Sequence, residues 1–541
     1  MAKNNFFFLA VFILISFEGF SADRYVVYFL DKLNTPYNTG QPEVFLSNKA
    51  IERRFRQNIE ISDTDFPVNP QYVSEIRPLA TAVHYKSRWF NAVLVEADNE
   101  QIEEIKKLPF VQKVDYVALG PQDSRRVRRD SRPKINQLKR TANNSSFQNQ
   151  LLGVDIMHEA GFKGEGIIIG VFDGGFMNVD SLNFFSHIFK NDRIVYTYDF
   201  VRNDSFVYDF DRHGTEVLST IGAYKENEIV GAAYNADFIL CITEEVVKEY
   251  RVEEYNWLFA AEAADSAGVD IINSSLGYNT FSDPSMDYRY EDLDGKTAVI
   301  TVAANMATQK GILIVSSAGN EGNKAWKYIT APADAEGVLT VGSVNSNSEL
   351  SSFSSIGPTV DGRLKPDVVA LGNSAVVGKI DGSIGVNNGT SFSSPQVAGL
   401  AAGILQANRD LTTIQLLQKI RMSGTHAVNP NNKVGYGVPN FVRAQNNIVL
   451  SVGENRLKRF KIYPNPANAG EIFISADENM PKGLVNLKIH SSSGQLLLDK
   501  NIQLSTSSKA IPININNIPP GLYGVTISTK KYTEKVKIIK N

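Results

Sequence analysis

Cysteine is almost absent from this chain, and its scarcity limits how the fold can be held together. Cys241 is the only cysteine among 541 residues, so no disulfide can form within one chain. A small disulfide-stapled scaffold is therefore excluded, and stability must come from core packing, with bound ions as the remaining aid. The length leaves room for about two to four domains.

An excess of charge of one sign is also lacking. The formal net charge is −3, and 43% of the residues are hydrophobic and 21% are charged. These proportions are typical of a folded soluble protein. The near-neutral balance gives no argument for a nucleic-acid or membrane-surface partner, and we expect neither.

Long apolar runs are confined to the N-terminus. Residues 6–17 form an apolar run behind Lys3, and small residues at 19 and 21 follow it. This pattern predicts a secretory signal peptide over residues 1–22. An uncleaved membrane anchor is the less favoured alternative, because the run is shorter than the ~20 residues of a membrane-spanning helix. No stable membrane span is expected after signal removal.

Residues 23–120 are predicted to form a small α+β domain. Aromatic and β-branched residues at 24–30 and 91–96 indicate strands, and apolar residues recur at helical spacing over 100–108.

A basic segment separates this domain from the rest of the chain. Residues 125–140 contain eight Lys or Arg residues and a single acid, Asp130. Because like charges repel, residues 121–150 are predicted to be an extended, accessible linker.

Residues 151–446 alternate short apolar runs with segments long enough for crossover helices. Four continuous runs lie at residues 166–172, 236–242, 269–273 and 311–316. Continuous rather than alternating apolar runs are typical of strands buried on both faces of a parallel sheet. The expected fold class is therefore α/β, with a doubly wound, mostly parallel sheet. Residues 452–541 contain short β-like runs between turn residues and predict a small all-β domain.

Asp173 and His213 lie next to apolar segments of the α/β region. Asp173 ends an apolar run before two glycines, at the sheet edge where α/β proteins bind ligands. His213 precedes an apolar helical pattern. Taken alone, each has an ordinary alternative: an Asp that caps a turn or helix, and a structural His.

Two further motifs lie later in the same region. Asn320 follows another apolar run in a turn flanked by glycines, and its amide is suited to donate to a developing oxyanion. Ser391 is expected just before a helix that has Pro395 in its first turn. The alternatives are an ordinary Asn-Gly turn and a Ser/Thr-rich helix cap.

Together the four motifs resemble those of subtilisin-like serine proteases (subtilases) in identity, context and chain order. The resemblance implies a serine endopeptidase that acts on polypeptides through an acyl-enzyme intermediate. Asp173, His213 and Ser391 would form its triad, and Asn320 would be an oxyanion donor. An α/β-hydrolase is excluded because it needs Gly-x-Ser-x-Gly and the opposite order. The alternative is a catalytically inactive subtilase scaffold that serves as a surface binding protein.

The resemblance extends to the segments that bind substrate. Ser275, Leu276 and Gly277 resemble the edge segment that pairs with the substrate backbone, and Ala318 and Gly319 would line the primary specificity pocket. The physiological substrate and the residue preferred before the cut bond stay open.

Metal use is a separate question, because the implied chemistry requires no cofactor. Relatives often bind structural calcium, and Asp292, Asp294 and the acid-rich stretch 199–211 could supply oxygen ligands. Glu216 stands where many family members have a second histidine, so metal use or stability could differ there.

Both flanking regions also resemble known modules. Residues 23–120 resemble the family's propeptide, an intramolecular chaperone and inhibitor, which makes the basic linker the expected processing zone. A solvated spacer is the alternative. The C-terminal region resembles the sorting domain of the type IX secretion machinery. Its matching pieces are Tyr463–Pro466, Ser493–Gly494, Pro520–Tyr523 and Lys535–Lys540. A generic β-sandwich is the alternative. Together these regions imply passage through the periplasm to the cell surface or medium.

Overall fold

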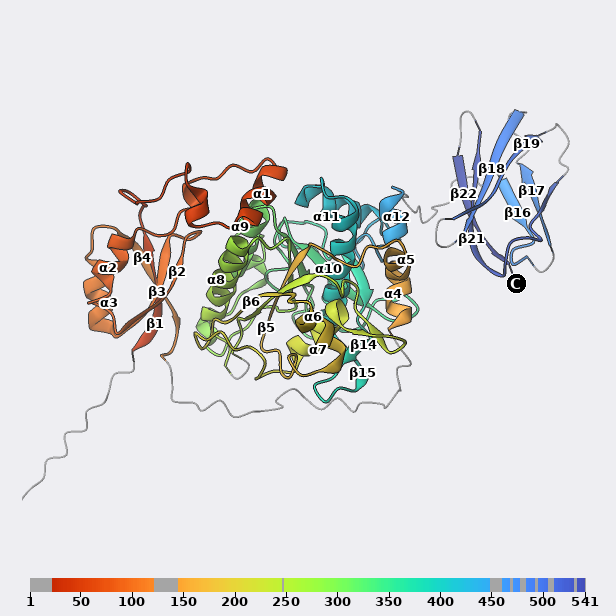
Figure 1. Cartoon of the computed structure of the whole chain (residues 1–541). Coiled ribbons are helices and arrows are strands. Elements are labelled where there is room, and N and C mark those ends of the chain that lie inside the picture. The colour runs from red at the N-terminus through yellow and green to blue at the C-terminus, as the bar shows by residue number, and fades with distance from the viewer. Residues whose placement is uncertain are drawn as a thin grey trace, which may run out of the picture. The chain divides into compact units, whose positions relative to one another are not determined.

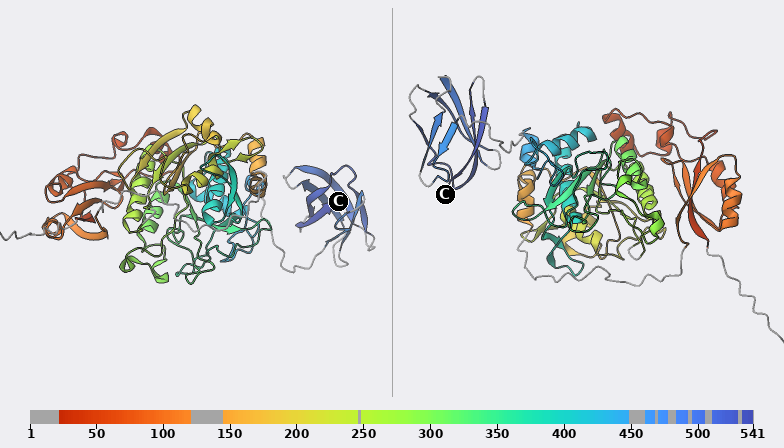
Figure 2. Two further views of the ribbon diagram at one scale, coloured as in Figure 1. Left: turned by 90° about the horizontal axis from the view of Figure 1, so that it is seen from below. Right: turned by 180° about the vertical axis from the view of Figure 1, so that it is seen from behind.

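The structure is a computed structural model of the whole chain (Figures 1 and 2). It describes residues 22–120, 145–245 and 248–447, and in the C-terminal module 460–467, 470–476, 483–491, 495–504, 510–529 and 533–540. Nearly all of the predicted signal peptide, most of the basic linker and the motif at 493–494 lie outside the described residues.

A small antiparallel sheet organises residues 22–41 and 62–120. Its strand order is β2-β3-β1-β4. Along the chain, one helix lies between β1 and β2 and another lies between β3 and β4. The elements are β1 (Asp23–Phe29), α2 (Pro70–Ile76), β2 (Ala82–Ser87), β3 (Ala92–Ala97), α3 (Asn99–Lys106) and β4 (Val111–Ala118). Apolar side chains from strands and helices share one core, which confirms the predicted α+β class. The intervening residues 42–61, with α1 (Asn48–Arg56), group with the larger unit.

A seven-stranded sheet forms the centre of the larger unit, in the order β13-β12-β11-β10-β5-β9-β6. The strands are β5 (Ile168–Asp173), β6 (Ile194–Asp199), β9 (Asp237–Ile242), β10 (Ile271–Ser274), β11 (Leu313–Ser317), β12 (Leu339–Val344) and β13 (Val368–Leu371). Every neighbouring pair is parallel. The four continuous apolar runs coincide with β5, β9, β10 and β11, so the doubly wound α/β prediction is confirmed.

Helices cover both faces of this sheet (Figure 1). α7 (His213–Gly222) and α10 (Thr390–Ala407) lie on one face, and α8 (Val252–Ala267) and α9 (Val299–Gln309) lie on the other. The remaining helices are α4 (Ser146–Leu152), α5 (Val154–Glu159), α6 (Ser186–Lys190), α11 (Thr413–Met422) and α12 (Phe441–Gln445). Two hairpins are formed by β7 (Tyr224–Lys225) with β8 (Ile229–Val230) and by β14 (Ala375–Gly378) with β15 (Ile384–Asn387).

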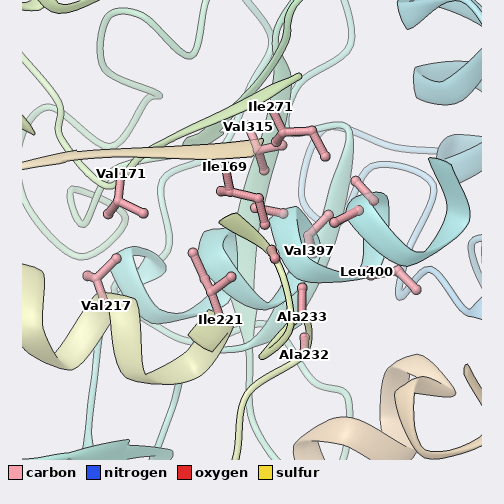
Figure 3. Close-up of a cluster of buried hydrophobic side chains, with 14 of the residues drawn as sticks. Ile169, Val171, Val217, Ile221, Ala232, Ala233, Ile271, Val315, Val397 and Leu400 are labelled. Atoms are coloured by element: carbon pink, nitrogen blue, oxygen red, sulfur yellow. The ribbon is translucent and has the colours of Figure 1, made fainter. Parts of the chain in front are cut away.

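The core between the sheet and α7 and α10 consists of aliphatic side chains (Figure 3). Ile169 and Val171 of β5 face Val217 of α7, and Leu400 of α10 packs in the same cluster; all four are 0% exposed. Burying each such side chain contributes about 1.5–3 kcal/mol. Gly399 lets α10 approach closely, because a Cβ there would lie 2.5 Å from that of Ala232.

The C-terminal module contains two antiparallel sheets around its own core. Their orders are β16-β17-β20 and β19-β18-β21-β22. The strands are β16 (Phe460–Tyr463), β17 (Glu471–Ala476), β18 (Gly483–Ser491), β19 (Leu496–Leu504), β20 (Ile511–Asn514), β21 (Gly521–Ser528) and β22 (Thr533–Lys540). Asn465 accepts a hydrogen bond from the backbone of Ile539 at 2.9 Å, so two of the motifs meet. The all-β prediction is confirmed.

The first turn of α8 carries an acid that the fold buries completely. Glu253 is 0% exposed. Burial raises the pKa of its carboxyl well above the usual value, and the nearby Glu244 and Glu249 raise it further. A carboxyl whose folded-state pKa is raised favours folding below its unfolded pKa of about 4.3. That contribution is lost as the pH rises through the folded-state pKa.

We expect Glu253→Gln to increase the free energy of unfolding on the order of 1–2 kcal/mol at pH 8 and to change it little at pH 4. Glutamine keeps the shape of the protonated acid but cannot ionise. Denaturant unfolding at both pH values measures the difference, with the exposed Glu336→Gln as the control. An equal change at the two pH values would contradict the assignment of a buried, raised pKa.

Candidate active site

Asp173 and His213 form a buried pair at the carboxyl end of the central sheet. Both carboxylate oxygens of Asp173 lie 2.9 Å from Nδ1 of His213. The Asp173 side chain is 0% exposed and that of His213 is 6% exposed. The backbone N–H of Gly174 donates to the same carboxylate at 2.8 Å. With Nδ1 facing the carboxylate, Nε2 is the ring nitrogen left to face a reacting group.

The start of α7 holds His213 against the end of β5. Asp211 accepts a hydrogen bond from the His213 backbone N–H at 3.0 Å, which holds the first residue of α7 in place. The next residue, Gly214, packs against the backbone of Gly175, where a Cβ would lie 2.3 Å from the carbonyl oxygen. Only glycine allows this approach of helix to strand end.

Ser391 lies inside the first turn of α10, not before it, and Pro395 lies one turn further into the helix. The prediction that Ser391 precedes the helix was therefore wrong. Proline has no N–H, so the carbonyl of Ser391, four residues before Pro395, lacks its helical partner. Since only this one bond is missing, the helix can still begin at Thr390, before the proline. Ser275 supplies the missing donor: its hydroxyl donates to that carbonyl at 2.9 Å.

The Ser391 side chain is nearly buried and has a defined partner. Ser391 is 8% exposed, and its Oγ donates to the backbone oxygen of Ser275 at 3.3 Å rather than to His213. The neighbouring Phe392 ring lies 5.6 Å from the His213 ring, centroid to centroid. The first turn of α10 therefore lies against the Asp173–His213 pair.

The side-chain amide of Asn320 is fixed beside the same helix start. Its Oδ1 accepts two hydrogen bonds from Thr390, from the backbone N–H at 2.9 Å and from the hydroxyl at 3.1 Å. Because the oxygen is occupied, the NH₂ group is the end of the amide left to bind another molecule. Thr390 was not predicted to have a role; only its position beside Ser391 in the sequence pointed to it.

The two predicted substrate-binding segments leave neighbouring parallel strands. Residues 275–277 follow β10 and residues 318–319 follow β11, and these strands pair in register. Sequence reasoning missed Thr330, which lies between them: its Oγ1 would be 2.2 Å from a Cβ on Gly277 and 2.9 Å from one on Gly319. Thr330 lies 53 residues after Gly277 and 11 after Gly319 and carries no motif, so only the fold reveals it.

An open cavity of about 610 Å³ is lined by residues that follow the two segments in the chain. Its lining residues are Asn279, Thr280, Glu321, Lys324, Ala325 and Trp326. Asn279 and Thr280 come two and three residues after the edge segment, and Glu321 comes directly after Asn320.

A family model matches the larger unit. The family model described as the subtilase family matches residues 164–437, about half of the chain. The chain belongs to the subtilase family.

Individual relatives of this subtilase include subtilisins of two Bacillus species. It is 29% identical to subtilisin NAT of Bacillus subtilis subsp. natto over 350 residues, 64% of this chain and 79% of that protein. It is 32% identical to a subtilisin of Bacillus pumilus over 273 residues, 50% of this chain and 88% of that protein. A solved structure of a cold adapted subtilisin-like serine proteinase is 28% identical, covers 52% of this chain and 88% of its own, and has a TM-score of 0.39.

The flanking regions of this subtilase match family models as well. A peptidase S8 propeptide domain found in Bacteroidota matches residues 24–133, and a secretion-system C-terminal sorting domain matches residues 461–541. The sorting domain indicates secretion or display at the cell surface, which confirms the expected localisation. None of the helices in the described ranges is long and apolar enough to span a membrane.

Glu216, where this subtilase departs from many family members, is part of an ion pair. Its carboxylate is buried, lies 3.1 Å from Nζ of Lys379 and accepts a hydrogen bond from Asn387 at 2.6 Å. It therefore ties α7 to the β14–β15 hairpin.

The acids suggested as calcium ligands are engaged by protein donors. Asp294 accepts from the backbone of Lys296 and Thr297, and Asp199 accepts from Arg202. No group of three or more His, Cys, Asp or Glu suited to a metal occurs within the described residues. Structural calcium stays a prediction.

We expect Gly214→Ala to lower the free energy of unfolding by about 1–3 kcal/mol, because the added methyl group must displace the backbone of Gly175. Denaturant unfolding of the purified protein measures the loss. Gly385→Ala is the matched control, since its Cβ would meet only the flexible side chain of Lys379. Equal stability of the two variants would contradict the close packing of α7 on β5.

Proposed function

We propose that this subtilase is a secreted serine endopeptidase with Asp173, His213 and Ser391 as its catalytic triad. The observation that supports this most directly is the Asp173–His213 pair, buried beside a helix start that presents Ser391. The pair has the two properties a general base needs: a fixed orientation and a partner for the cation that forms when it takes a proton.

In the proposed reaction, His213 takes the proton of Ser391 as Oγ attacks the peptide carbonyl. The Oγ–carbon bond forms, the carbon–nitrogen bond then breaks, and His213 returns the proton to the departing amine. Water repeats the sequence on the acyl-enzyme and releases the acid. Because Ser391 Oγ donates to Ser275 in the structure, it must rotate from that carbonyl toward His213 when substrate binds.

The negative oxygen formed on the carbonyl carbon needs preorganised donors. The NH₂ group of Asn320 and the backbone N–H of Ser391 lie at the same helix start and are suited to this role. The edge segment 275–277 would pair with the substrate backbone as an added strand. Ala318 and Gly319 would line the pocket for the side chain before the cut bond.

The propeptide and the linker complete the proposal. The propeptide domain would act as the inhibitor of the uncut chain, and cutting within the basic linker would release activity. The eight basic residues over 125–140 predict an accessible segment, because like charges repel.

A fluorophosphonate probe, which reacts with activated serines, tests the assignment of the nucleophile. We expect the mature wild-type protein to be labelled and Ser391→Ala to remain unlabelled. Mass mapping of the labelled chain should show that it starts within or beyond the linker. Absence of labelling on a correctly processed wild-type protein would instead favour the inactive-scaffold alternative.

The Asn320→Ala variant, measured in the same experiment, tests the oxyanion donor. Its labelling should persist but become slower, and kcat should fall by about 100- to 1,000-fold, as in subtilisin itself when one oxyanion donor is lost. KM should change little, because the donor acts mainly on the transition state.

Removal of residues 452–541 tests the sorting step. We expect the truncated enzyme to accumulate in the periplasm, because the segment recognised by the type IX machinery is gone, while its probe labelling is retained. Fractionation of cells and medium measures the distribution. Unchanged release into the medium would refute a sorting role.

A further inference from the structure

Residues 42–61 belong to the propeptide match by sequence but to the catalytic unit by structure. The propeptide family model covers 24–133, yet this segment groups with the larger unit that contains the sheet and the candidate site. Figure 1 shows α1 lying at one end of α8 and α9. The contacts that hold it there involve the C-terminal ends of both helices.

The segment supplies hydrogen-bond donors to the end of α8. The backbone N–H of Ser47 donates to the carbonyl of Ser266 at 2.9 Å. The guanidinium of Arg53 donates to the carbonyls of Asp265 and Val269. The last carbonyls of a helix have no partner within it, and a cation near them is favoured by the helix dipole. Arg53 therefore satisfies both requirements at once.

The same segment serves the end of α9 and the start of α11. Arg53 Nε donates to the carbonyl of Lys310 at 3.2 Å, and Gln57 Nε2 donates to that of Gly311 at 2.7 Å. The other end of the Gln57 amide accepts a hydrogen bond from the backbone N–H of Thr413 at 2.8 Å. In total, five carbonyl groups at the ends of two helices receive donors from this segment.

A buried ion cluster anchors α1 to α8. Arg53 and Arg54 both bind the carboxylate of Asp265, the latter at 2.8 Å. The two arginine side chains are 1% exposed and the aspartate is 0% exposed. A buried charge that loses its partner is strongly destabilising. The cluster therefore favours binding of α1 at this one position beside Asp265.

The surface beneath the segment is shaped for it. Gly268 and Gly311 follow α8 and α9 with φ of 91° and 82°, a conformation that favours glycine. A Cβ on Gly268 would lie 2.7 Å from the Cβ of Lys49, and one on Gly311 would lie 2.7 Å from Nε2 of Gln57. The segment occupies the space that any larger residue would need.

We propose that residues 42–61 stay bound to the catalytic domain after the linker is cut, as a second, non-covalently held chain of the mature enzyme. The inference rests on the proposed function, since it presupposes cutting between the propeptide and the catalytic domain. Its basis is that release would leave five carbonyl groups without these donors and would remove Arg53 and Arg54 from Asp265 at the same time.

Co-purification of the active enzyme tests this directly. Full-length protein is expressed, allowed to mature, labelled with the fluorophosphonate probe and passed over a size-exclusion column without denaturant. Denaturing mass spectrometry should then find a peptide containing residues 42–61 in equal amount with the labelled chain. A labelled chain free of this peptide would overturn the inference and leave the proposed function intact. An unlabelled chain that retains the peptide would do the reverse.

Variants test whether the described contacts hold the peptide. Asp265→Asn should speed its loss by about 30-fold or more, because two buried arginines lose their counter-charge. Gln57→Ala should speed the loss by a smaller factor and leaves the ion cluster intact, so it keeps the test valid if Asp265→Asn fails to fold. Glu52→Gln, an exposed change on the same helix, is the control. Equal retention in Gln57→Ala and Glu52→Gln would contradict the proposed anchoring.

Discussion

The parallel sheet, buried on both faces by helices, is the constraint on which the rest of the structure depends. Because all seven strands run the same way, their carboxyl ends meet at one edge. β5 ends at Asp173, β10 leads into the edge segment 275–277, and β11 leads toward Asn320. Residues far apart in the sequence are thus brought together by strand direction alone, and the helix starts of α7 and α10 add His213 and Ser391.

Three buried carboxyl groups are each stabilised in a different way. Asp173 faces the His213 ring and a backbone N–H. Asp265 is neutralised by two arginines of the propeptide region. Glu253 has other acids as neighbours, and its raised pKa keeps it protonated over a wider pH range. In each case the cost of removing a carboxylate from water is offset by a different local device.

The boundary between propeptide and enzyme is less sharp in space than in sequence. Residues 47–57 of the propeptide region supply donors to the ends of two helices of the catalytic unit, and two of them, Arg53 and Arg54, pair with the buried Asp265 of α8. The packing of the catalytic unit therefore depends in part on this segment, through hydrogen bonds and ion pairs. The sorting module, by contrast, has a complete core of its own.

The sequence by itself determined the fold class and the candidate site residues, because both signals are local. Continuous apolar runs predicted β5, β9, β10 and β11, and short motifs identified Asp173, His213, Asn320 and Ser391. Tertiary structure alone decided what depends on distant partners. Ser275 donates to the carbonyl that Pro395 leaves without a helical partner, and Thr330 fills the space between two glycines. Arg53 is buried with Asp265, more than 200 residues away, as its partner. No local sequence pattern predicts such pairings, because the partners come into contact only in the folded chain.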